Sequence, residues 1–188
     1  MKTFAVIGSR NPEGKTARAT DALLQGAAAA GSSADSILLP EKRIERCRQC
    51  DERGWGLCLT DGRCAIEDDF GPVMEGLRDA DVAVFATPVY FGDLSESMRA
   101  FLDRLRRCLR FEPRRAGIEE MPAVGICVAG GGGGGATSCA LSLEKALATC
   151  AFNVLDVIPV RRQNLELKLD ILRRTGEWLP RGIPPPTE

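Results

Sequence analysis

The chain of 188 residues contains no histidine, and this absence excludes several kinds of active site. Histidine is the most frequent general acid or base near neutral pH and the most frequent metal ligand. Without it, neither a Ser–His nor a Cys–His catalytic pair can be built. If the protein is an enzyme, we therefore expect a bound cofactor to supply the chemistry.

Strong charge of one sign and long apolar segments are also absent. The formal net charge is −1, so the sequence gives no sign of a nucleic-acid partner. No apolar run approaches the roughly 20 residues of a membrane-spanning helix. The first residues enter a strand-like segment without the pattern of a secretory signal peptide. We therefore expect a cytoplasmic protein with no membrane partner.

Five short apolar segments alternate with helical patterns along the chain. The expected strands cover residues 3–7, 35–39, 82–86, 123–129 and 154–160. Continuous apolar runs are typical of strands buried on both faces, as in a parallel sheet. The alternation predicts an α/β fold with a doubly wound sheet, in a single domain over residues 1–180 followed by a proline-rich tail at 181–188. Asp68 and Asp69 are expected to cap the helix that precedes the third strand.

The turn at residues 8–16, Gly-Ser-Arg-Asn-Pro-Glu-Gly-Lys-Thr, joins the first strand to the first helix. Backbone N–H groups and the helix dipole favour an anion at this place. The hydroxyls of Ser9 and Thr16 and the charges of Arg10 and Lys15 suit a phosphate monoester. A nucleotide P-loop needs four residues between its glycines, and this turn has five. An ordinary turn with a helix cap remains an alternative.

Two further turns follow the third and fourth strands. Residues 88–92 read Pro-Val-Tyr-Phe-Gly, and residues 130–135 are all glycine. Ligands of parallel sheets bind at the carboxyl ends of the strands. The aromatic rings of Tyr90 and Phe91 could face a cofactor there, and glycine lets the backbone approach a flat ligand. Alternatively, the rings fill space beside the next helix and the glycines form a flexible linker.

Eight cysteines divide into two groups. Four lie in a long irregular segment, residues 40–66, with the spacing Cys-x2-Cys-x7-Cys-x5-Cys: Cys47, Cys50, Cys58 and Cys64. These thiols could hold an iron–sulfur cluster or zinc, or they could be free or redox-labile. The other four lie in expected strands or helices, where cysteine behaves as a small buried apolar residue: Cys108, Cys127, Cys139 and Cys150.

One segment, TPVYFGDLSESMRAFLDR at residues 87–104, resembles the flavin-contacting loop and following helix of the NADPH-dependent FMN reductase and iron–sulfur flavoprotein families. The first turn adds Gly8-Ser9 and Gly14-x-Thr16, and the resemblance covers about residues 1–160. It implies a flavodoxin-like fold with strand order 2-1-3-4-5 and a long cysteine-rich insertion after strand 2. It also implies an FMN site made by Ser9, Arg10, Asn11, Gly14, Lys15, Thr16, Pro88, Val89, Tyr90, Phe91, Gly92, Gly130, Gly131, Gly132 and Gly133.

By the same resemblance, electrons would pass from NAD(P)H through FMN to a small acceptor, namely a quinone, a free flavin or a metal. A homodimer or homotetramer is implied as well. The alternative is an electron-transfer protein with a [4Fe–4S] cluster on the cysteine loop. Iron–sulfur flavoproteins use a tighter cysteine run, and Cys58 falls five residues later than their third ligand. We therefore expect FMN without stoichiometric iron.

Overall fold

A five-stranded parallel sheet forms the centre of the computed structural model, which describes residues 1–109 and 118–183. Its strands are β1 (Lys2–Ile7), β2 (Ser33–Leu38), β3 (Val82–Pro88), β4 (Pro122–Ala129) and β5 (Asn153–Arg161). Their order is β2-β1-β3-β4-β5, and all neighbours are parallel. The predicted flavodoxin-like topology is confirmed. The expected tail falls partly outside the described residues, which end at 183.

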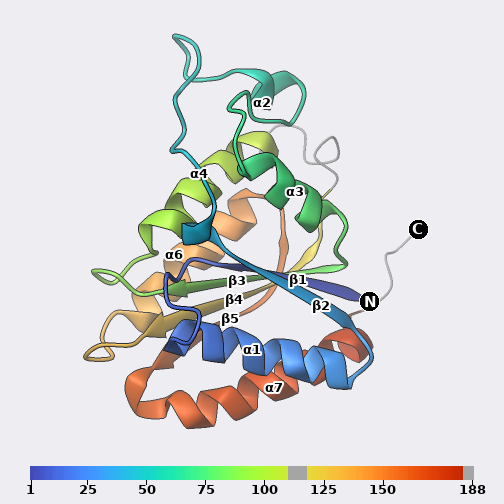
Figure 1. Cartoon of the computed structure of the whole chain (residues 1–188), viewed down its shortest axis with the longest axis vertical. Coiled ribbons are helices and arrows are strands. Elements are labelled where there is room, and N and C mark those ends of the chain that lie inside the picture. Colours follow the sequence, from blue (N-terminus) through green and yellow to red (C-terminus); the bar gives the residue numbers. More distant parts are fainter. Residues whose placement is uncertain (110–117, 184–188) are drawn as a thin grey trace.

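Helices cover both faces of the sheet (Figure 1). One face carries α1 (Lys15–Ala29) and α7 (Leu165–Gly182), and the other carries α3 (Phe70–Arg78), α4 (Glu96–Leu109) and α6 (Ala136–Thr149). Each face has its own hydrophobic core, so the apolar strands β3 and β4 are buried on both sides. Within the described ranges, no helix combines the length and apolar character needed to cross a membrane.

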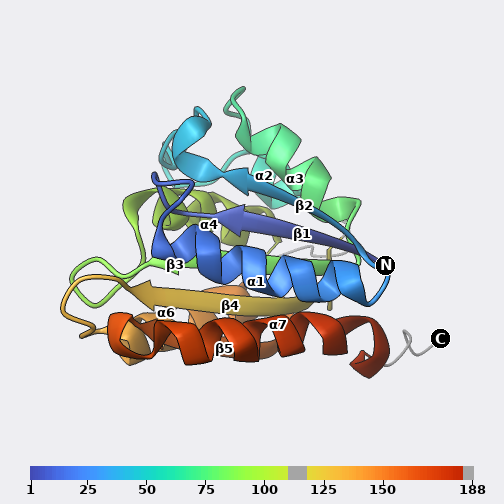
Figure 2. The same cartoon turned by 60° about the horizontal axis from the view of Figure 1, so that its bottom comes forward.

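Glycines allow α1 and α7 to pack side by side, as Figure 2 shows. A Cβ atom at Gly26 would lie 1.9 Å from the carbonyl oxygen of Arg173. A Cβ at Gly176 would lie 2.0 Å from the carbonyl oxygen of Leu23. Two helix backbones can approach this closely only where neither carries a side chain at the contact. These glycines were not singled out by the sequence analysis.

The segment between β2 and α3 is irregular apart from the short helices η1 (Leu39–Glu41) and α2 (Leu57–Thr60). The prediction that the Asp69 side chain caps α3 is wrong. Asp69 occupies the N-cap position, but its side chain forms no capping hydrogen bond. Its carboxylate instead accepts the N–H of Arg43 at 2.7 Å. Asp68 accepts the N–H of Phe70 at 3.1 Å, but it also forms a buried ion pair with Arg104 of α4. The acidic pair therefore anchors this segment to the sheet-covering helices.

The four cysteines expected in regular elements are buried, which confirms their predicted role in packing: Cys108, Cys127, Cys139 and Cys150.

Candidate functional site

Three βα turns meet at the carboxyl edge of the sheet. The turn after β3 touches the turn after β4, because a Cβ atom at Gly135 would lie 2.6 Å from Cα of Gly92. The turn after β4 also approaches the turn after β1, since a Cβ at Gly130 would lie 3.7 Å from Cδ of Lys15. The segments predicted to bind a cofactor are thus brought together at one edge of the sheet.

The first turn is held in shape by its own polar groups. Ser9 is buried, and its hydroxyl accepts the N–H of Asn11 at 3.3 Å. The side-chain oxygen of Asn11 accepts the N–H of Glu13 at 2.9 Å, and the backbone carbonyl of Asn11 accepts the N–H of Gly14 at 3.1 Å. The side chain of Asn11 therefore builds the turn. The helix α1 begins after Gly14 with no acidic residue in its first turn, so its positive end is open to an anion.

The second turn adopts a left-handed conformation at two successive residues. Phe91 has φ of 51° and Gly92 has φ of 77°. Tyr90 and Asp93 close the turn with two backbone hydrogen bonds of 2.9 and 3.0 Å. A positive φ is uncommon for a residue with a bulky side chain, and such conformations are concentrated at functional sites. The ring of Phe91 is fully exposed.

The backbone of this turn has two N–H groups left over for a ligand. Val89 donates to the carbonyl of Val128 at 3.0 Å, and Tyr90 donates to Asp93. Within the described part of the chain, no backbone carbonyl accepts the N–H of Phe91 or Gly92. These two backbone N–H groups of the turn are therefore available to a ligand.

The glycine run after β4 is fixed by side chains that the sequence analysis did not select. Gln163, just beyond β5, donates its amide N–H to the carbonyl of Gly132 at 2.9 Å. Ser138, in the first turn of α6, donates to the carbonyl of Gly92 at 2.8 Å. Gln163 follows the fifth strand, and this position was the one feature of the sequence that could have indicated a role at the carboxyl edge of the sheet. Hydrogen bonds from Gln163 and Ser138 therefore fix the conformation of the glycine turn, in contrast to the alternative of a flexible linker.

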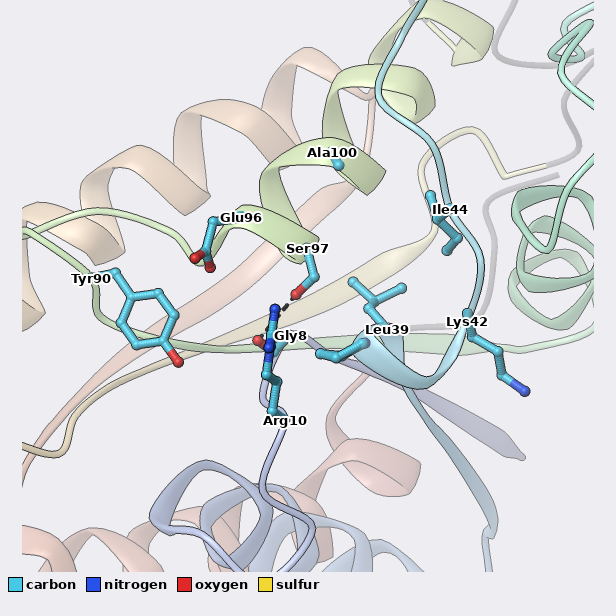
Figure 3. A pocket seen from close by; sticks show the side chains of 10 residues that line it. Gly8, Arg10, Leu39, Lys42, Ile44, Tyr90, Glu96, Ser97 and Ala100 are labelled. Atoms are coloured by element: carbon cyan, nitrogen blue, oxygen red, sulfur yellow. Dashed lines mark hydrogen bonds between the residues drawn. The ribbon is translucent and has the colours of Figure 1, made fainter.

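A pocket of about 420 Å³ opens between the end of β2 and the start of α4 (Figure 3). Its walls come from the ends of β1 and β2 and from the β3–α4 connection. Leu39, Ile44 and Ala100 supply apolar surface, and Arg10 and Tyr90 connect the pocket with the first and second turns. Two of the predicted site residues thus face this neighbouring pocket. This volume lies within the range of small-molecule sites.

The four loop cysteines line a second, small cavity at the far end of α4, together with the buried Cys108. The cavity has a volume of about 10 Å³, which suffices for roughly one water molecule. Among the described residues, no group of three or more cysteine or acidic side chains is arranged to hold a metal ion. As placed, the thiols do not fit a four-iron cluster, and the absence of iron remains a prediction.

Two arginines of α4 enclose this cysteine cavity. Arg104 binds Asp68 through both carboxylate oxygens, at 2.6 and 2.9 Å, and Arg107 stacks over the ring of Trp55 at 4.8 Å. In the described part of the chain, the buried Nε atoms of both arginines lack a hydrogen-bond acceptor. Burial raises the pKa of the Cys58 thiol and raises that of Cys108 to about 12. These two thiols are therefore protonated at neutral pH.

Comparison with known proteins supports the fold and defines the family. Residues 1–164 match the family model described as NADPH-dependent FMN reductase. An iron–sulfur flavoprotein of Methanocaldococcus jannaschii is 31% identical over 131 residues, covering 70% of this chain and 62% of that protein. An iron–sulfur flavoprotein of Methanosarcina thermophila is 28% identical over 104 residues, covering 55% of this chain and 52% of that protein. The chain thus spans little more than half the length of these relatives.

Two solved structures share the fold at low sequence identity. A flavone reductase superposes with a TM-score of 0.72 and 19% identity, covering 94% of this chain and 61% of that one. An NAD(P)H:quinone oxidoreductase from Methanothermobacter marburgensis superposes with a TM-score of 0.68 and 21% identity, covering 95% of this chain and 96% of that one. The family match extends from β1 through β5 and includes all three turns of the site. The chain therefore belongs to the NADPH-dependent FMN reductase family.

Proposed function

We propose that this protein is an FMN-dependent oxidoreductase that takes electrons from NAD(P)H and passes them to a small acceptor. The observation that carries this proposal is the meeting of three βα turns at one sheet edge, with a helix N-terminus beside them. Parallel sheets bind cofactors at this position. A quinone, a free flavin or a metal ion is the acceptor class that we propose.

The residues present fit FMN. The open N-terminus of α1, with Ser9 and Thr16 buried beside it, suits the 5′-phosphate. The glycines of the third turn leave room for a flat ring, because a Cβ atom at Gly131 or Gly132 would meet nothing within 4 Å. The N–H groups of Phe91 and Gly92 are available to polar atoms at the ring edge.

When bound, FMN supplies the capacity to accept a hydride, which explains how a chain without histidine could be a redox enzyme. The protein itself binds and orients. Ser9 and Thr16 hold the phosphate end, Gln163 and Ser138 hold the glycine turn in position, and Tyr90 shields one side of the ring. A fixed turn costs less entropy on binding than a mobile one.

The phosphate assignment predicts a difference between FMN and riboflavin. Replacement of both Ser9 and Thr16 by Ala removes two hydroxyl donors to a dianion. One charge-assisted hydrogen bond contributes roughly 1.5–3 kcal/mol. We therefore expect FMN affinity to fall about tenfold or more, with riboflavin affinity little changed, in a fluorescence titration. Equal losses for both ligands would mean that the hydroxyls support folding only.

A second candidate function is electron transfer between proteins, with an iron–sulfur cluster beside FMN. It is favoured by the names of the relatives, which are iron–sulfur flavoproteins, and by the gathering of five thiols at one cavity. The small volume of that cavity and the late position of Cys58 favour the reductase.

Iron analysis after anaerobic purification separates the two candidates. We expect stoichiometric FMN and well under one iron per chain, with no acid-labile sulfide. NADPH should still reduce the flavin. About four irons per chain, lost in Cys50→Ser but kept in the buried-site control Cys150→Ser, would reject this prediction and support the electron carrier.

A further inference from the structure

Helix α7 is apolar over a wider face than the rest of the chain covers. Leu172 and Leu179 are buried in the core between α7 and the sheet. The residues directly before them, Ile171 and Trp178, are 39% and 48% exposed. Residues seven apart on a helix share a face, because seven residues make about two turns. Ile171 and Trp178 therefore form a second apolar stripe beside the buried one.

These two side chains line an open hollow of about 460 Å³ between α7 and β5, which we call the α7–β5 groove. Leu155 of β5 and Val124 of β4 add apolar surface to it. Figure 2 shows α7 running along this edge of the sheet, where β5 has only β4 beside it in the described part of the chain. Single exposed apolar residues need no explanation, but apolar side chains gathered around one hollow are typical of an interaction surface.

The α7–β5 groove also contains one charge of each sign. Asp156 of β5 and Arg174 of α7 line it, and both are exposed. Within residues 1–109 and 118–183, neither side chain forms an ion pair or a hydrogen bond, so the two are not paired with each other. A partner surface of a single charge sign would bring a like charge against one of them. A second copy of the groove, turned about a two-fold axis, matches both, because each contact of such an interface occurs twice.

We propose that the α7–β5 groove is the contact surface of a homodimer, in which two copies of this chain pair their grooves around a two-fold axis. Asp156 of each copy pairs with the partner's Arg174, and Trp178 packs against the apolar side chains of the opposite groove. Tryptophan and arginine are enriched among the residues that contribute most to binding at protein interfaces. The proposal does not depend on the proposed function.

The contact is made by side chains and not by pairing of the two β5 strands. Pro159 of β5 has no N–H to donate, and proline on an edge strand disfavours pairing with a further strand. Leu155 and Asp156 lie near the amino end of β5, whereas the three turns lie at the carboxyl edge of the sheet. This surface is therefore separate from the proposed flavin site and leaves that site open.

An exchange of charges tests the proposal by sedimentation equilibrium of the whole chain. The unmodified protein should form a particle of at least twice the chain mass of 20.3 kDa. Asp156→Arg and Arg174→Asp should each halve the mass of that particle at micromolar concentration. The dissociation constant should rise about 100-fold or more, because like charges then meet twice in each interface. Combining the two replacements restores opposite charges across the axis, so the double variant should regain the mass of the unmodified protein.

Asp35→Arg is the matched control, because Asp35 is an exposed carboxylate of β2, the strand at the opposite edge of the sheet. It should leave the particle mass unchanged. Trp178→Ala removes apolar contact without changing charge, and it should also halve the mass. All three replaced side chains of the groove are exposed, and urea unfolding checks that each variant is folded.

A monomeric unmodified protein at micromolar concentration would overturn the inference. Unchanged masses in the single variants would also overturn it, and would leave the groove to another occupant, such as residues 184–188. A double variant that stays at half the mass would mean that Asp156 and the partner's Arg174 do not meet, which contradicts the proposed pairing.

Discussion

Replacing Asp68 by Asn should destabilise the protein by about 3–5 kcal/mol, which is the usual cost of leaving one partner of a buried ion pair without its counter-charge. The Asp68–Arg104 pair is bidentate, and both side chains are 0% exposed. Arg104 also donates to the carbonyls of Glu45 and Ile66. The pair therefore connects the cysteine segment to α4, the helix that starts beside the proposed flavin site.

Urea unfolding of the variant measures this loss. The matched control is Arg48→Gln, which removes the Arg48–Glu45 pair of the same 2.6 Å separation but with side chains 60% and 43% exposed. Exposed pairs contribute about 0–1 kcal/mol. A double replacement, Asp68→Leu with Arg104→Leu, should cost less than the sum of the two single replacements, because no unpaired charge is left. Equal effects of Asp68→Asn and Arg48→Gln would contradict this account.

The same carboxylate makes stability depend on pH in the acid range. Burial opposes ionisation of Asp68, but hydrogen bonds from Arg104 and from the N–H groups of Glu45 and Phe70 outweigh it and lower its pKa. A lowered pKa means that the ionised group favours the folded state. Its contribution is complete above the unfolded pKa of about 4 and is lost as pH falls through the folded value. In Asp68→Asn this part of the acid destabilisation should be absent.

Gly135→Ala should weaken FMN binding about tenfold or more, whereas Gly134→Ala should leave it nearly unchanged. Gly135 has φ of 79°, and its Cβ atom would lie 2.6 Å from Cα of Gly92. Neither backbone can yield without separating the second and third turns. At Gly134, a Cβ atom meets nothing within 4 Å. The two substitutions add the same methyl group at neighbouring positions of one turn.

Fluorescence titration with FMN compares the two variants, and urea unfolding reports on their stability. If both variants bind FMN equally well, the contact between the second and third turns does not shape the site. If FMN affinity falls equally in both variants, the glycine run acts as a flexible segment, and the assignment of a shaped turn is wrong.

The sheet was predictable because parallel strands covered on both faces must be apolar throughout. β3 and β4 show such runs, and both are buried. The positions of the three turns followed from the strands, since turns after parallel strands share one edge. The strand order came only from the family resemblance, because the period of a strand does not tell which strand lies beside it.

Other features depend on contacts between distant segments and could not be predicted from local pattern. Asp68 and Arg104 are 36 residues apart, so the acidic pair looked like a helix cap. Gly26 and Gly176 look like ordinary helix glycines until α1 and α7 are placed together.

The central claim is that the three turns form one FMN site, and a comparison of FMN with riboflavin tests it most directly. Anaerobic titration of the FMN-free protein, followed by addition of NADPH, reports binding by flavin fluorescence and reduction by bleaching of the flavin absorbance. The account predicts one FMN per chain, bound at least about tenfold more tightly than riboflavin, and reduced by NADPH. No FMN binding, or equal binding of FMN and riboflavin, would contradict it.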